Sequence, residues 1–215
     1  MDELSRLAIF HGTDKMGGHT YCPIYHAYFS HLRNEQFKLL EIGFGGWSKK
    51  NGYNEPTLGG ESARMFAEFF PNAEVTVVDI VPKIVFDEPF VFKQGDQSDK
   101  AFLTSLGSQR IIIDDGSHRS EDQITTFETL FPLMPDGGIY VIEDTQTSYW
   151  KELSPGRTAM DYFKARTDRL NYNEIRGERR GDYFDKNIFS IHFYHNLIFI
   201  FKGDNTEPSN SVTHD

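Results

Sequence analysis

The sequence predicts a single α/β domain, in which a mostly parallel β-sheet ends in an antiparallel C-terminal hairpin. Short apolar runs recur along the chain, and helical stretches separate several of them. Strands that alternate with helices are typical of βαβ units, whose strands run parallel. The last two apolar runs are separated by only a short polar turn, so these two strands are expected to run antiparallel.

Five continuous apolar runs are predicted as strands of the parallel part. They comprise residues 37–43, 74–80, 90–96, 110–116 and 138–144. Runs of this kind indicate strands that are buried on both faces. The final segment, residues 188–203, is predicted as a hairpin that turns near Tyr194–Asn196.

Two stretches between these runs have the spacing of amphipathic helices. Residues 61–70 place apolar side chains on one face and are followed by Pro71, which favours a helix end. Residues 120–131 show the same periodicity. Ser120 and Gln123 at the start of this second stretch have the spacing of a capping box.

The 215 residues are enough for one domain with a sizeable core. We expect residues 1–203 to form that domain, with residues 1–35 as an N-terminal flap segment. The tail 204–215 is polar and lacks apolar periodicity, so it is expected to be disordered and frayed.

Composition restricts the classes of partner. The net charge of -10 argues against nucleic acid and against an anionic membrane surface, both of which favour basic proteins. Cys22 is the only cysteine, so the chain can form no intramolecular disulfide. No apolar run is long enough to span a bilayer. These features together predict a cytoplasmic protein.

Two polar segments leave alternatives open. Residues 11–29 are either a plain surface helix preceded by a loop, or a flap that brings side chains to a ligand. In the second case the candidates are Thr13, Lys15, Tyr21 and Tyr25. Residues 154–184 are rich in Arg, Tyr and Asn and are a candidate for acceptor contacts, whereas the cluster 176–180 within them can equally be a solvated loop.

Acidic side chains gather at the ends of the predicted strands. In open parallel sheets the ligand binds at the carboxyl ends of the strands. A single acid there is usually a turn or helix cap, but this explanation is hard to sustain for all five strands. The residues concerned are Glu41, Asp79, Asp96, Asp114, Asp115, Glu143 and Asp144.

The first three strands carry features that suit S-adenosylmethionine. Gly43 and Gly45 in 41-EIGFGG-46 allow a nucleoside to approach the backbone. Glu41, the acid that precedes these glycines, suits a cationic or hydroxyl-rich ligand better than a pyrophosphate. Asp79 is expected to accept hydrogen bonds from ribose hydroxyls, while Asp96 and Gln97 are placed to meet an adenine edge.

Several motifs carry a resemblance to a known family. They are GTDK (12–15), YCPIY (21–25), EIGFGG (41–46), PTLGGES (56–62), GDQSD (95–99), DDGSH (114–118) and EDTQTSYW (143–150). With them, the chain resembles the Rossmann-like class I S-adenosylmethionine-dependent methyltransferases. It is most similar to the metal-dependent sugar O-methyltransferases of macrolide biosynthesis, of the mycinamicin and macrocin type. Some members carry an additional N-terminal domain, for which this chain is expected to have no room.

The resemblance implies a metal site and a general base. Asp115, Glu143 and Asp144 correspond to the acids that bind a divalent cation, usually Mg²⁺, which prefers carboxylate oxygens. The alternative is that the two adjacent acids cap a loop or pair with arginine. His118 corresponds to the general base, a role that suits histidine because this residue type titrates near neutral pH. The alternatives are an exposed spectator histidine and Asp115 as the base.

Two further positions receive roles with less support from the pattern. Asp114 either contacts the cofactor or supports the loop, and Ser62, at a helix start, is placed to donate to the methionine carboxylate of the cofactor. The reaction implied is Mg²⁺-dependent methyl transfer from S-adenosylmethionine to a sugar hydroxyl of a glycosylated natural product or saccharide. The alternatives are a catechol-like phenol O-methyltransferase and a non-catalytic cofactor-binding module. The sequence leaves open the acceptor, the hydroxyl position and whether the chain forms a homo-oligomer.

Overall fold

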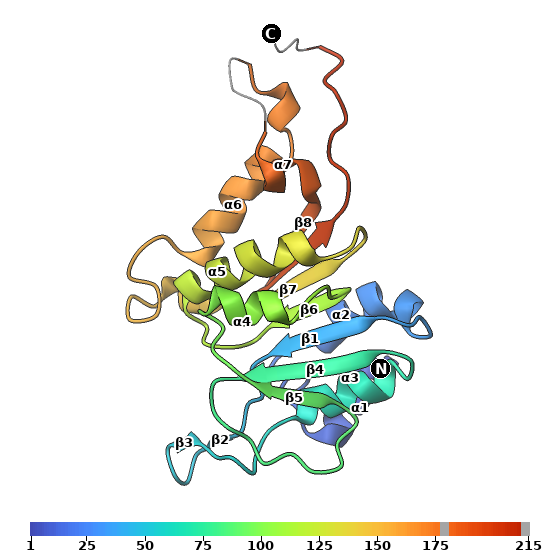
Figure 1. The fold of residues 1–215 in the computed structure, drawn as a ribbon, viewed down its shortest axis with the longest axis vertical. Coiled ribbons are helices and arrows are strands. Elements are labelled where there is room, and N and C mark those ends of the chain that lie inside the picture. The colour runs from blue at the N-terminus through green and yellow to red at the C-terminus, as the bar shows by residue number, and fades with distance from the viewer. Residues whose placement is uncertain (177–180, 212–215) are drawn as a thin grey trace. The chain divides into compact units, whose positions relative to one another are not determined.

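The computed structural model describes residues 1–176 and 181–211. The chain forms two compact units, Met1–Phe102 and Leu103–Asp215, drawn from blue to green and from green to red in Figure 1. The last four residues of the predicted tail, and residues 177–180 of the predicted solvated cluster, lie outside the described residues.

The first unit contains three parallel strands. They are β1 (Lys38–Ile42), β4 (Glu74–Asp79) and β5 (Val91–Gln94), with β4 in the middle. The positions of all three were predicted from the apolar runs. A small antiparallel ribbon, β2 (Trp47–Ser48) and β3 (Tyr53–Asn54), stands apart from them and was not predicted (Figure 1).

The N-terminal residues form helices that pack against the predicted helix of this unit. The helical elements are α1 (Glu3–His11), α2 (Cys22–Phe29), η1 (Ser30–Leu32) and α3 (Glu61–Phe69). Helix α1 contacts both α2 and α3, and α3 contacts β4. Aromatic rings join α2 to α3: Tyr25 meets Phe66 edge to face, with 5.7 Å between the ring centroids. The sequence YCPIY is therefore in part a packing motif.

The second unit contains the rest of the strands. They are β6 (Ile111–Asp114), β7 (Ile139–Glu143), β8 (Ile188–Tyr194) and β9 (Leu197–Lys202), in the spatial order β6-β7-β9-β8. Strands β6 and β7 are parallel, whereas β9 is antiparallel to both β7 and β8. Parallel pairing in both units and the antiparallel hairpin confirm the predicted fold class.

Helices and short 3-10 turns complete this unit. They are α5 (Ser120–Leu130), η2 (Phe131–Leu133), η3 (Thr145–Tyr149), α6 (Ala159–Arg169), η4 (Tyr172–Glu174) and α7 (Tyr183–Asn187). A further short helix, α4 (Lys100–Ser105), contains the boundary between the units. None of the helices in the described ranges has both the length and the apolar character needed to cross a bilayer.

Two details of the prediction were wrong. Strand β5 is largely exposed rather than buried on both faces, because it is an edge strand. The capping box at Ser120 does not form: Arg119 occupies the N-cap position of α5, and no side chain caps the helix there. Ser120 is instead the first residue of the helix, and its hydroxyl is used elsewhere.

Helix α6 lies in the segment 154–184, for which no helix was predicted. Its buried face consists of Ala159, Tyr162 and Phe163. Arg166 and Arg169 both contact the buried carboxylate of Asp185, at 3.1 and 2.8 Å. The described start of the tail is bonded to the same region, because the side chain of Asn205 donates to the carbonyl oxygens of Leu170 and Asp185. The disorder of the tail stays a prediction.

Candidate metal and cofactor sites

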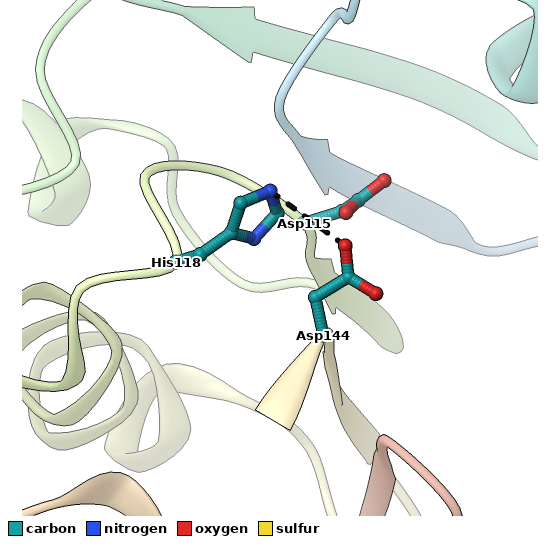
Figure 2. Close-up of side chains that lie close together, drawn as sticks. All are labelled: Asp115, His118 and Asp144. Atoms are coloured by element: carbon teal, nitrogen blue, oxygen red, sulfur yellow. Dashed lines mark ion pairs between the residues drawn. The ribbon is translucent and has the colours of Figure 1, made fainter. Parts of the chain in front are cut away.

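Three side chains of the second unit converge at the ends of β6 and β7. Among the described residues, Asp115, His118 and Asp144 each offer one ligand atom, and these atoms lie within 4.8 Å of one another. Asp115 directly follows β6, and Asp144 directly follows β7. The two strands are parallel neighbours, so their carboxyl ends meet at the same edge. Figure 2 shows the imidazole directed at the Asp144 carboxylate, with Asp115 beside them.

The histidine in this cluster has one nitrogen toward the acids and one turned inward. His118 Nε2 lies 3.8 Å from Asp144 Oδ2, which is an ion pair when the ring is protonated. Its Nδ1 is buried and has no hydrogen-bond partner among the described residues. The ring is therefore not held by a second group in the way that ligand-binding histidines usually are.

The backbone is strained at two of these three positions. In the described parts of the chain four non-glycine residues have positive φ, and two of them are His118 (φ 56) and Asp144 (φ 54). A non-glycine residue in this region costs about 1–3 kcal/mol and persists only where its surroundings fix it. Such strain in both chain segments of one cluster is typical of a functional site.

Glu143 was predicted as a ligand, but the structure does not bring it into the cluster. It is the last residue of β7 and is 2% exposed, and its backbone carbonyl accepts a hydrogen bond of 3.3 Å from Gln123. Neighbouring residues along a strand direct their side chains to opposite faces, which separates Glu143 from Asp144. Its role as a ligand stays a prediction.

The three converging groups fit a divalent cation. Two carboxylates and an imidazole can bind several divalent metals, and replacement of the imidazole by Glu143 would give the all-oxygen set that Mg²⁺ prefers. The two ligand sets therefore predict different roles for His118, as a metal ligand or as a base.

Asp114 lies beneath the cluster and is fully buried. The hydroxyl of Tyr140, which is also fully buried, donates a 3.1 Å hydrogen bond to Asp114 Oδ2. Burial and the nearby Asp114 carboxylate raise the pKa of Tyr140 well above its ordinary value, so the phenol remains a neutral donor. Of the two roles predicted for Asp114, this contact favours support of the loop that carries Asp115.

In the first unit, Asp79 anchors the glycine loop. The amide of Phe44 donates to Asp79 Oδ2 at 2.9 Å, and the amide of Val81 donates to Oδ1 at 2.8 Å. Gly43 and Gly45 have φ values of 99° and 74°, which explains the need for glycine there. Each carboxylate oxygen accepts one backbone bond and retains a second lone pair, so the predicted contact with ribose stays open.

The second glycine motif packs directly against the first. The amide of Gly60 donates to the carbonyl oxygen of Phe44 at 2.8 Å, and a Cβ on Gly59 would overlap that oxygen. Space beside Gly45 is open, with no atom within 4 Å of where its Cβ would lie. Ser62 follows in the first turn of α3. This cradle of glycines fits the close approach of a nucleoside.

Lys83 is a residue of this site that the sequence did not reveal. Its Nζ donates to three backbone carbonyls, those of Gly45 (2.6 Å), Glu55 (3.1 Å) and Leu58 (3.3 Å). Burial lowers the pKa of Lys83. The ammonium group thus joins the glycine loop to the segment before the second glycine motif. A lysine in an irregular segment has no sequence signal for such a role.

The N-terminal loop contributes a buried ion pair. Lys15 Nζ lies 3.5 Å from Glu41 Oε1, and the two side chains are 1% and 0% exposed. Of the flap candidates, Lys15 therefore reaches the strand that leads into the glycine loop. Beyond β5, Asp96 is exposed and accepts hydrogen bonds from Ser98, while Gln97 is buried. The contacts of Asp96 and Gln97 with adenine stay a prediction.

No protein-family model matches the chain. The 8-demethyl-8-α-L-rhamnosyl tetracenomycin-C 2'-O-methyltransferase of Streptomyces olivaceus is 40% identical over 94% of this chain and 55% of its own length. The mycinamicin VI 2''-O-methyltransferase of Micromonospora griseorubida is 38% identical over 95% of this chain and 54% of its own length.

A solved structure matches the whole chain. MycE, a methyltransferase from the mycinamycin biosynthetic pathway solved in complex with Mg and SAH, is 36% identical, with a TM-score of 0.89 over 100% of this chain and 58% of MycE. The chain has the Rossmann-like methyltransferase fold. The similarity to sugar O-methyltransferases that the motifs indicated is thereby confirmed. The chain spans about half the length of the relatives that it matches.

Substitution of Asp79 and of Lys83 can separate support of the glycine loop from direct contact with S-adenosylmethionine. We expect Asp79→Ala to weaken S-adenosylmethionine binding by about 1.5–3 kcal/mol, because hydrogen bonds to a charged group are lost. Lys83→Met removes loop support alone, so the loss of cofactor affinity should be smaller than in Asp79→Ala. Isothermal titration calorimetry measures both. Equal losses in the two variants would mean that Asp79 acts only on the loop, and unchanged affinity in Asp79→Ala would remove it from the site.

Proposed function

We propose that this chain is an S-adenosylmethionine-dependent, Mg²⁺-dependent O-methyltransferase that acts on a sugar hydroxyl of a glycosylated natural product or saccharide. The observation that carries the proposal is the convergence of Asp115, His118 and Asp144 in a chain 36–40% identical to named sugar O-methyltransferases and to MycE. MycE has also been solved in complex with Mg, SAH and mycinamycin VI, which supports a metal, the cofactor and a glycosylated acceptor here.

In this proposal the first unit binds the methyl donor. The glycine loop presents backbone without side chains to the nucleoside, and Asp79 accepts hydrogen bonds from ribose while it holds the loop. Gln97 meets the adenine edge, and Ser62 donates to the methionine carboxylate. Glu41, neutralised in part by Lys15, supports the strand beneath the loop.

The second unit binds and activates the acceptor. Asp115 and Asp144 hold the divalent cation, together with Glu143 in the set that the resemblance implies. A bound Mg²⁺ would polarise and orient the acceptor hydroxyl. His118 takes the proton of that hydroxyl, and the Asp144 carboxylate, 3.8 Å from Nε2, stabilises the positively charged ring that results. These residues fix the acceptor oxygen for in-line attack on the methyl carbon.

Composition supports the remaining parts of the proposal. The net charge of -10 favours a small-molecule acceptor over nucleic acid. We place the protein in the cytoplasm, because its single cysteine, Cys22, is buried and provides no intramolecular disulfide.

Methyl transfer by the purified chain tests the proposal. Radiolabelled S-adenosylmethionine and MgCl₂ are supplied with rhamnosylated polyketides, with catechol, or with no acceptor. We expect label in the glycoside, at a sugar oxygen identified by NMR. Transfer to catechol alone would favour the phenol methyltransferase. Cofactor binding without transfer to any acceptor would favour a non-catalytic binding module.

A further inference from the structure

A chain of buried hydroxyl groups connects the two segments that carry the candidate metal cluster. Its members come from three places in the second unit: the first turn of α5, the 3-10 turn η3 after β7, and the loop before α6. All are nearly inaccessible to solvent. The residues are Ser120, Thr147 and Ser154, with exposures of 1%, 2% and 8%.

The hydrogen bonds in this chain have a defined direction. The amide of Ala159 donates to Ser120 Oγ at 2.9 Å, and the two serine hydroxyls, Ser120 and Ser154, lie 2.6 Å apart. Ser154 donates its one hydroxyl proton to the carbonyl oxygen of Thr147, at 3.1 Å. Ser120 must therefore be the donor between the two serines. The hydroxyls of Ser120 and Ser154 are thus each used as both donor and acceptor.

The hydrogen-bonded path ends on the backbone carbonyl of Asp144, a residue of the cluster. Thr147 donates twice to the carbonyl oxygen of Asp144, from its amide at 3.1 Å and from Oγ1 at 2.9 Å. At the other end, Ser120 lies two residues after His118. A path of hydrogen bonds thus runs from Ser120, in the chain segment of His118, through Ser154 and Thr147 to the backbone of Asp144. His118 and Asp144 both have a left-handed backbone.

We propose that Ser120 and Ser154 are positioning residues, which set the separation between His118 and Asp144 and thereby the affinity of the cluster for a divalent cation. The inference rests on the proposed function. A left-handed backbone at a non-glycine residue persists only where neighbouring bonds fix it, and this path supplies such bonds to both segments. The serines do not reach the ligand; they act through the residues that do.

The path also explains why Ser120 does not cap its helix. Its hydroxyl accepts the first amide of α6 and donates to Ser154, so it is not available to the amides of α5. A serine at a helix start normally gains stability by capping. Here the hydroxyl of Ser120 instead connects α5 to the start of α6 and to the loop before α6.

The test measures metal binding directly. Mn²⁺ is titrated into the full chain, and the free ion is counted by its electron paramagnetic resonance signal. We expect Ser120→Ala and Ser154→Ala each to weaken Mn²⁺ binding by about 10–100-fold, as loss of a group that orients a metal ligand does. The double variant should be no weaker than either single variant, because one cut already interrupts the path. SAH affinity should be unchanged in all three.

Thr129→Ala is the matched control. Its hydroxyl lies on the same helix and donates to the carbonyl of Thr125, outside the path, so Mn²⁺ affinity should stay at the wild-type value. If Ser120→Ala does not fold, Ser154→Ala tests the positioning role by itself, because Ser154 is the more exposed of the two serines. Wild-type Mn²⁺ affinity in Ser154→Ala, or additive losses in the double variant, would overturn the positioning role. Absence of Mn²⁺ binding by the wild-type chain would overturn the proposed metal site instead.

Discussion

Asp144→Asn is expected to lower kcat/KM for methyl transfer by about 10³-fold. A bound cation contributes several kcal/mol by stabilising the charge that develops in the transition state, and this contribution would be lost with the cation. Asparagine is the sharpest replacement, because it removes the charge but tolerates the left-handed backbone (φ 54) that this position requires. Mn²⁺ binding should be lost with the activity, and EDTA should abolish the activity of the wild-type chain until Mg²⁺ is added in excess.

Asp136→Asn is the control for the loss of one negative charge, because Asp136 is an exposed residue of the turn before β7. It should leave both activity and metal binding intact. Full activity of the wild-type chain in EDTA, with no metal bound, would instead mean that the acids only cap the loop.

Glu143→Gln decides which set of groups binds the cation. If the resemblance identifies the ligands correctly, this substitution should weaken Mn²⁺ binding as strongly as Asp144→Asn does. If the arrangement of Asp115, His118 and Asp144 is the ligand set, Glu143→Gln should be mild for metal binding. Any loss would then be one of stability, since the Glu143 side chain is nearly fully buried.

The strands could be predicted from sequence because their signal is local. Continuous runs such as 110–116 and 138–144 have the composition of buried strands, and the acids at their ends mark the edge where ligands bind. Asp115, His118 and Asp144 converge because β6 and β7 are neighbouring parallel strands. This pairing follows from the alternation of strands and helices, which the sequence displays.

Contacts between distant residues could not be predicted in this way. Lys83 donates to carbonyl groups up to 38 positions away, and Ser120 is bonded to Ser154, 34 positions along the chain. Backbone carbonyls and serine hydroxyls occur everywhere in a sequence, so no residue type marks such a pair. For Ser120, at the start of α5, the sequence was misleading. Its local spacing favours a capping box, but in the structure its hydroxyl is bonded to Ser154 instead.

Helix α6 was missed for a related reason. Its buried face is short, with Ala159, Tyr162 and Phe163, and the rest of the helix pairs through Arg166 and Arg169 with the buried Asp185. Charges at helical spacing do not stand out in a sequence as a long apolar stripe does. The missed helix and the missed hydroxyl path meet at Ala159, the first residue of α6, whose amide donates to Ser120.

His118→Asn is expected to lower kcat by about 10²–10⁴-fold if the histidine is the general base, the usual contribution of proton transfer by a positioned group. Asparagine again suits the left-handed backbone (φ 56), so the loop should be retained, whereas His118→Ala adds backbone strain to the chemical loss. Comparison of the two variants separates these effects. His195→Asn, in the exposed turn between β8 and β9, is the matched control and should be neutral.

The same variant distinguishes a base from a metal ligand. A base can be removed without effect on the dissociation constants for Mn²⁺ and SAH, and a rise in pH should partly restore kcat, because the acceptor hydroxyl then ionises without help. A ligand cannot be removed in this way: His118→Asn would weaken Mn²⁺ binding, and a rise in pH would not restore the rate at subsaturating metal. If Asp115 is the base instead, Asp115→Asn should show the pH rescue and His118→Asn should be mild. Wild-type kcat in His118→Asn at neutral pH would end the general-base role and leave the imidazole as a neighbour of the acids.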